Sequence, residues 1–245
     1  MKLINIIIFI VFSITTNLFA QNAAESRQQK KLQLTQYSNH FEIFAEAIPF
    51  SVNTESGILA HFTYLDSFKP LKEGEITLYL EIDDEIVSQK LSTPTKVGIY
   101  KFNIIPTKVG TGTLTFEIKT KDGTEKVAIN NITVFGDKHV AQSDANNKFI
   151  KHPKGITYYK EKSWYVNFST AKVDFKNKPN IAVPQQAVIK QNGKMYVFVQ
   201  LHPELFIKQE IKATMPNNNS YIVYKGLQKG ERYVNKGVVY LLKSR

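Results

Sequence analysis

The chain has 245 residues, 42% of them hydrophobic, with a formal net charge of +11 and no cysteine. Without cysteine it can form no disulfide, thiolate metal site or lipoprotein anchor. The positive charge is almost entirely lysine, because Arg27, Arg232 and Arg245 are the only arginines. A nucleic-acid-binding protein usually clusters its basic residues and uses arginine, so the composition argues against a nucleic-acid partner. It favours a solvated basic surface, with anionic lipid headgroups or an acidic partner as the alternative.

Residues 1–20 have the pattern of a secretory signal peptide. Lys2 precedes an apolar run from Leu3 to Phe12, and a small residue, Ala20, stands before Gln21. Cleavage after Ala20 is predicted, which places the mature protein in the periplasm. The apolar run is shorter than the roughly 20 residues of a transmembrane helix, and an uncleaved inner-membrane anchor is the alternative.

Residues 21–37 are polar and rich in Gln and Lys, which predicts a flexible leader. Residues 38–136 then show short apolar runs separated by turn signals, the pattern of an immunoglobulin-like β-sandwich with seven strands. Ile76, Leu78 and Leu80 alternate with polar residues, as expected of a strand with one buried face. The expected strands are 41–47, 59–64, 75–82, 85–91, 98–105, 113–119 and 126–135.

Residues 137–153 contain few large apolar side chains and are expected to be a linker or a single helical turn. Residues 154–245 predict a second β domain, in which Asn192-Gly193 forms a tight hairpin. No segment after the signal shows a helical period, so an all-β fold is expected. The expected strands of this domain are 156–159, 164–173, 187–190, 195–200, 206–213, 221–224 and 233–242.

Three segments, in this order, resemble periplasmic adaptor (membrane fusion) proteins of heavy-metal resistance-nodulation-division efflux systems, in the form common among Bacteroidetes-like bacteria. The first resembles the extra N-terminal β domain of those adaptors, and the second the strand that enters their membrane-proximal domain. The third resembles their closing segment. The segments are HFEIFAE (40–46) with AHFTYL (60–65) and FKP (68–70), then ITYYKEKSWYVNF (156–168), and then Val183-Pro184 through MYVFV (195–199) and Phe206 to Gly226-Leu227 and Gly230-Glu231.

The chain also departs from that family. In the adaptors a lipoyl domain, usually a helical hairpin, and a β-barrel lie between the second and third segments, whereas here only residues 174–180 separate them. Such an excision is tolerable if the strands that enter and leave the membrane-proximal domain lie close together. Residues 164–173 are therefore expected to be a strand inside the C-terminal domain.

The resemblance implies a non-catalytic, adaptor-like subunit or accessory of an efflux system, with metal cations as the candidate cargo. Its partners would be an inner-membrane pump and a full-length adaptor, and an oligomer is compatible with that role. The alternative is a freestanding periplasmic module that binds a metal ion or a carbohydrate, the latter through an aromatic cluster around Trp164. No hydrolase, phosphate-binding or metalloprotease motif is present, so no enzyme is expected.

One set of residues is a candidate metal site. His40, Glu42 and Glu46 share one face of the strand expected at 41–47, because side chains alternate with a period of two. His61 is expected to approach them from the next strand. Imidazole and carboxylate groups are suitable ligands for divalent metals, although a solvated strand face would show the same pattern. No other cofactor is expected.

Overall fold

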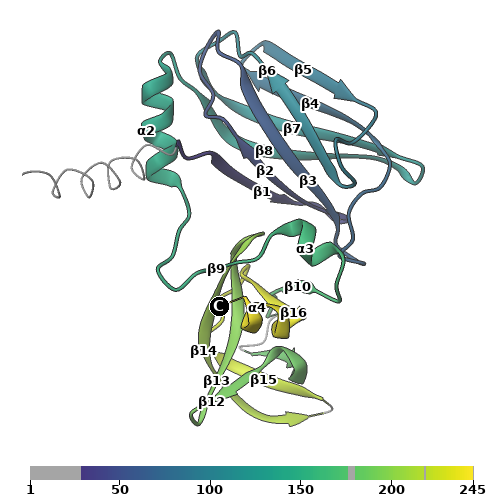
Figure 1. Cartoon of the computed structure of the whole chain (residues 1–245), viewed down its shortest axis with the longest axis vertical. Coiled ribbons are helices and arrows are strands. Elements are labelled where there is room, and N and C mark those ends of the chain that lie inside the picture. Colours follow the sequence, from purple (N-terminus) through teal and green to yellow (C-terminus); the bar gives the residue numbers. More distant parts are fainter. Residues whose placement is uncertain (1–28, 176–179, 218, 245) are drawn as a thin grey trace, which may run out of the picture.

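The computed structural model describes residues 29–175, 180–217 and 219–244. The expected signal peptide, the first part of the expected leader and most of the short connection after residue 175 lie outside these residues. The prediction of an all-β fold is confirmed: two β units follow one another along the longest axis (Figure 1). No helix among the described residues has the length and hydropathy needed to cross a membrane.

The N-terminal unit is a sandwich of two four-stranded antiparallel sheets. Their strand orders are β1-β2-β3-β6 and β5-β4-β7-β8. The inner faces build one apolar core, in which the Phe62 ring meets Tyr100 and Phe116 edge-on. The strands are β1 (Leu32–Tyr37), β2 (Phe41–Ala47), β3 (Ser56–Tyr64), β4 (Glu75–Ile82), β5 (Glu85–Leu91), β6 (Ile99–Ile104), β7 (Gly110–Thr120) and β8 (Gly123–Val134).

Two expectations for the edges of this unit were wrong. β1 occupies the end of the segment that was assigned to a flexible leader, because Leu32 and Leu34 pack against the sandwich core. The expected linker holds an 11-residue helix, α2 (Lys138–Lys148). The Asp137 side chain accepts hydrogen bonds from two backbone N–H groups at its start, as an N-cap should. Gln142 of this helix donates to the carbonyl oxygen of Lys30, which ties α2 to the start of β1.

The C-terminal unit contains one twisted sheet with strand order β10-β16-β13-β14-β15-β11. β12 pairs with β13, and β9 pairs with β14. Since β9 and β10 precede the short connection and their partners follow it, the segments on its two sides close into one β unit, as the sequence predicts. The elements are β9 (Ile156–Thr157), α3 (Lys160–Trp164), β10 (Ser169–Lys172), β11 (Ile181–Pro184), the 3-10 helix η1 (Gln185–Ala187), β12 (Ile189–Gln191), β13 (Lys194–His202), β14 (Leu205–Asn217), β15 (Ser220–Lys225), β16 (Arg232–Lys236) and α4 (Val238–Lys243).

The two expected strands at 164–173 and 233–242 are each half right. Trp164 ends the short helix α3, and only β10 is extended. The last strand ends at Lys236, where Gly237 adopts a φ of 87° and turns the chain into α4. A Cβ atom on Gly237 would lie 2.8 Å from the carbonyl oxygen of Asn167, so the turn also needs the missing side chain. The Asn192-Gly193 hairpin between β12 and β13 is confirmed, with positive φ at both residues.

The two units share part of a core. Phe68 stands in the connection between β3 and β4 of the sandwich, yet it is buried in the apolar cluster of the C-terminal unit. Its ring lies 5.8 Å from that of Phe168. Domains joined by a small polar interface usually move independently, whereas a buried aromatic ring of one domain in the core of the other argues for a fixed arrangement.

Candidate functional site at the junction of the two domains

The junction is built on the outer face of β2 and β3, which turns away from the sandwich core. The outer face is defined by four side chains, Glu42, Phe44, His61 and Thr63, where Phe44 pairs with His61 and Glu42 with Thr63 across the two strands. All four are buried, although two of them are ionisable. Side chains of α3 and of the end of β13 contact them, and α3 lies directly below the sandwich (Figure 1).

A buried ion pair joins the domains at the centre of this face. The ammonium group of Lys160, at the start of α3, donates to Glu42 Oε1, and both side chains are at most 1% exposed. The same ammonium group lies 4.3 Å from the centroid of the Phe68 ring. Desolvating two charges costs several kcal/mol per ion, so this pair is worth little as net stabilisation. The pair favours one relative position of the two domains, because shifting one domain on the other would leave both charges buried and unpaired.

Trp164 fixes the position of α3 against the sandwich. Its indole Nε1 donates to Thr63 Oγ1 at 3.0 Å, and Lys69 Nζ donates to its carbonyl oxygen at 2.5 Å. Gly98, with φ of +79°, allows the approach, since a Cβ there would lie 2.9 Å from the Trp164 ring and 2.4 Å from Pro70. The ring is only 2% exposed, so it does not offer the stacking surface that the carbohydrate hypothesis assumed.

Two further contacts lie at the far side of the junction. His202, at the end of β13, stacks on Phe44 with ring centroids 5.4 Å apart, and burial lowers the pKa of His202 to about 4. The hydroxyl of Tyr37 on β1 donates to Gln200 Oε1 at 3.5 Å, and the Arg232 guanidinium lies 4.6 Å from its ring centroid. Burial, assisted by the Glu42 carboxylate, raises the pKa of Tyr37 above its usual value.

Beside the ion pair, three potential ligand groups converge. His61, Glu161 of α3 and Glu204 of the β13–β14 turn each offer one ligand atom, and these atoms lie within 4.8 Å of one another. His61 Nε2 and Glu161 Oε1 lie 3.7 Å apart. Burial lowers the pKa of His61 and raises that of Glu204 to about 7. Imidazole and carboxylate groups so arranged are able to bind a divalent cation.

The structure separates the four residues that the sequence analysis grouped as a metal site. Glu42 binds Lys160, and Glu46 lies 3.9 Å from Lys31. His40 pairs with Glu125 at 3.1 Å, and only His61 belongs to the three-residue cluster. Glu161 and Glu204 were missed, and the available signal was a polar His-Pro-Glu turn at 202–204 between two apolar strands.

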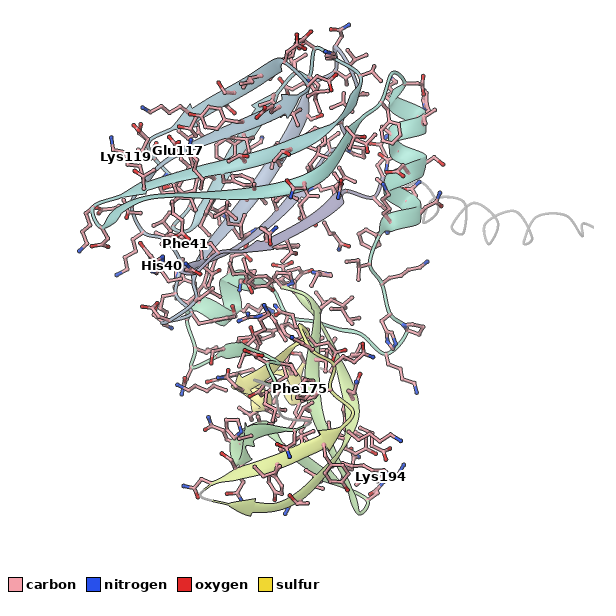
Figure 2. All side chains as sticks on the ribbon, turned by 180° about the vertical axis from the view of Figure 1, so that it is seen from behind. His40, Phe41, Glu117, Lys119, Phe175 and Lys194 are labelled. Atoms are coloured by element: carbon pink, nitrogen blue, oxygen red, sulfur yellow. The ribbon has the colours of Figure 1, made fainter. Side chains whose placement is uncertain are left out.

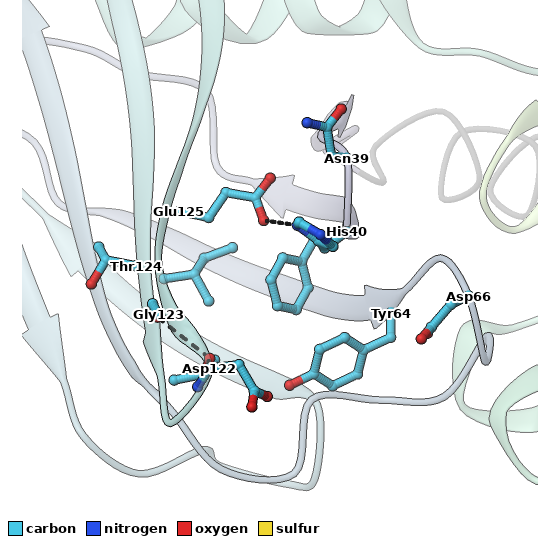
Figure 3. Close-up of a pocket in the computed structure, with 11 residues that line it drawn as sticks. Asn39, His40, Tyr64, Asp66, Asp122, Gly123, Thr124 and Glu125 are labelled. Atoms are coloured by element: carbon cyan, nitrogen blue, oxygen red, sulfur yellow. Dashed lines mark hydrogen bonds and ion pairs between the residues drawn. The ribbon is translucent and has the colours of Figure 1, made fainter.

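His40 lines a separate, open pocket at the end of the sandwich, of about 570 Å³ (Figure 3). Glu125 and the side chains of Tyr64, Asp66 and Asp122 surround it. His40 is largely exposed there, since 74% of its side chain is accessible. No group of three or more potential ligands gathers around it in the part of the chain that the structure describes.

The surface of the C-terminal domain is far more basic than that of the sandwich. Residues 154–245 contain 16 Lys and Arg against 5 Asp and Glu, a net charge of +11, whereas residues 1–153 contain 16 of each and are neutral. Lys194 marks the tip of the domain that lies farthest from the sandwich (Figure 2). Apolar side chains are exposed on the same domain, among them Tyr224 of β15 and Val239 of α4.

Comparisons with known proteins relate one part of the chain to a family. No curated protein and no solved structure matches it. One family model matches residues 181–243, and it describes the CzcB C-terminal circularly permuted SH3-like domain. The match covers the strands from β11 to β16 and helix α4, and it supports a relationship between this part of the chain and the membrane fusion adaptors.

Proposed function

We propose that this protein is a non-catalytic periplasmic subunit of a resistance-nodulation-division efflux system, and that its C-terminal domain docks onto the inner-membrane pump. The observation that carries the proposal is the match of residues 181–243 to the closing domain of an adaptor from heavy-metal efflux. The cargo of the system would then be a metal cation. The signal-peptide pattern of residues 1–20 is consistent with a periplasmic location.

The surface of the C-terminal domain is suited to such docking. Its net charge of +11 favours approach to an acidic protein surface or to the anionic headgroups around a pump. Tyr224 and Val239 are 54% and 49% exposed, and aromatic side chains such as that of Tyr224 are enriched at protein–protein interfaces. The sandwich is held at the opposite end, where it is available to a neighbouring subunit (Figure 1).

The rigid junction supports the same role. Phe68, the Glu42–Lys160 pair and Trp164 fix the sandwich on the C-terminal domain, so docking of one domain sets the position of the other. No element among the described residues has the form of the helical hairpin by which adaptors reach an outer-membrane channel. We therefore assign the protein to the pump side of the assembly.

Site-specific photo-crosslinking in the native cell envelope tests the proposal. A photoreactive amino acid at Tyr224 is expected to capture the pump subunit, identified by mass spectrometry. The matched control carries the same group at Ile86 on the sandwich, which is 61% exposed and should not capture the pump. The proposal is wrong if neither Tyr224 nor Val239 yields a pump adduct while the exported protein is folded and abundant.

A further inference from the structure

We propose that His61, Glu161 and Glu204 form a binding site for a divalent transition-metal cation, with Zn²⁺ as the best fit, that bridges the two domains. His61 belongs to β3 of the sandwich, whereas Glu161 and Glu204 belong to the C-terminal domain. The site exists only when the domains are docked. It is distinct from the docking function proposed above and does not depend on it.

The first argument is the state of the His61 side chain. It is 3% exposed, and neither of its ring nitrogens has a hydrogen-bond partner. A buried polar group without a partner destabilises the folded state, so a protein rarely keeps one without a reason. A cation bound to one ring nitrogen would use its lone pair.

The second argument is geometric. Tetrahedral Zn²⁺ with bonds of about 2.0–2.1 Å places its ligand atoms about 3.3 Å apart. The separation of 3.7 Å between His61 and Glu161 is close to this, and all three ligand atoms lie within 4.8 Å of one another. A rotation of the Glu161 side chain, which is 44% exposed, can close the remaining gap. The same exposure gives a cation a path from solvent.

The third argument concerns the surroundings of the ligands. The backbone N–H of Lys160 donates to Glu204 Oε1 at 2.8 Å, which orients that carboxylate. Metal-binding carboxylates are usually held in this way by an outer hydrogen bond. The nearby Lys160 ammonium group would repel a cation, but Glu42 neutralises it. Two carboxylates then balance the charge of a divalent ion.

The chemistry of the three proposed ligands limits which ion can bind. One imidazole and two carboxylates suit Zn²⁺ and its neighbours in the first transition series, whereas Mg²⁺ and Ca²⁺ prefer oxygen ligands alone. The chain has no cysteine, and Cu⁺ prefers thiolate or thioether ligands. With three protein ligands, the fourth position is left for water or for an exchanging ligand.

The sole tryptophan makes the site measurable. The Trp164 ring lies 5.8 Å from the His61 ring, so a cation on His61 should change its emission. We expect the purified, chelator-treated mature protein to take up one Zn²⁺ per chain by calorimetry, with a matching saturable change in fluorescence and no response to Mg²⁺. Glu161→Gln and Glu204→Gln should each weaken the affinity by about tenfold or more.

The control uses the other histidine–carboxylate pair of the sandwich. His40→Asn and Glu125→Gln remove an exposed pair of the same chemistry, and the affinity for Zn²⁺ should not change. Absence of saturable Zn²⁺ uptake overturns the proposal, as does an affinity for Zn²⁺ that Glu161→Gln leaves unchanged. Glu161→Gln changes a partly exposed side chain, and far-UV circular dichroism will confirm its folding. Uptake lost with His40→Asn would place the ion in the surface pocket instead and would equally overturn the proposal.

Discussion

The sheet β1-β2-β3-β6 has buried residues on both of its faces, but the two sets differ in kind. The inner face presents residues such as Ile43 and Phe62 to the second sheet and is mainly apolar. The outer face presents Glu42, His61 and Thr63 to the C-terminal domain and is largely polar. Apolar packing stabilises without strict orientation, whereas buried polar groups are satisfied in one arrangement only. The inner face therefore folds the sandwich, and the outer face sets the position of the second domain.

The largest effect is expected on the inner face. Phe62→Ala removes a fully buried ring that meets Tyr100 and Phe116, and the free energy of unfolding of the sandwich should fall by about 3–5 kcal/mol. Urea denaturation followed by far-UV circular dichroism measures this loss. A loss below about 1 kcal/mol would show that this face is not a close-packed core.

A smaller and more local effect is expected on the outer face. Lys160→Met leaves Glu42 buried without a partner, which costs about 3 kcal/mol or slightly more, but separation of the domains limits the cost because water then reaches the carboxylate. The emission of Trp164 should change at a lower urea concentration than the far-UV signal, because the junction opens before the sandwich unfolds.

The double variant Glu42→Leu with Lys160→Met is the matched control. It removes both charges and should recover most of the lost stability, since an apolar pair of similar size is often as stable as a buried ion pair. If the double variant is as unstable as the single one, the ion pair stabilises the protein in addition to setting the position of the domains. The outer face would then differ less from the inner face than proposed.

The smallest effect concerns alkaline pH. Burial raises the pKa of Tyr37 above its unfolded value near 10, so above that pH the unfolded chain loses this proton while the folded chain keeps it. Stability is then lost as the pH rises, by at most about 1.4 kcal/mol per pH unit for one group. Tyr37→Phe should make the stability curve between pH 10 and 12 less steep. An unchanged slope would mean that Tyr37 is not held in the junction.

Local signals predicted the local structure well. The bounds of β2, β4 and β5 follow from alternation and turn residues alone, and the Asn192-Gly193 hairpin follows from the tolerance of these residues for positive φ. Alternation identifies which residues share a face, and it placed Glu42 and His61 in the right region. It does not identify what covers that face, since the covering side chains come from residues more than 90 positions away.

The elements and site residues that the sequence analysis missed depend on contacts between distant parts of the chain. β1 is polar in composition and becomes a strand because Leu32 and Leu34 find an open edge of the core. α2 has only two buried alanines, so its helical period is weak, and its N-cap Asp137 was the one available signal. The placement of Glu161 and Glu204 beside His61 depends on the docking of two domains, which no local pattern encodes.

Phe68 has a consequence for how the protein must be made and handled. As the ribosome releases the chain from its N-terminus, the loop that carries this ring emerges long before the residues that will enclose it. A fragment that begins at residue 154 would keep every strand of its sheet, yet its apolar core would have a cavity in place of the Phe68 ring. The second half of this molecule is thus completed by the first.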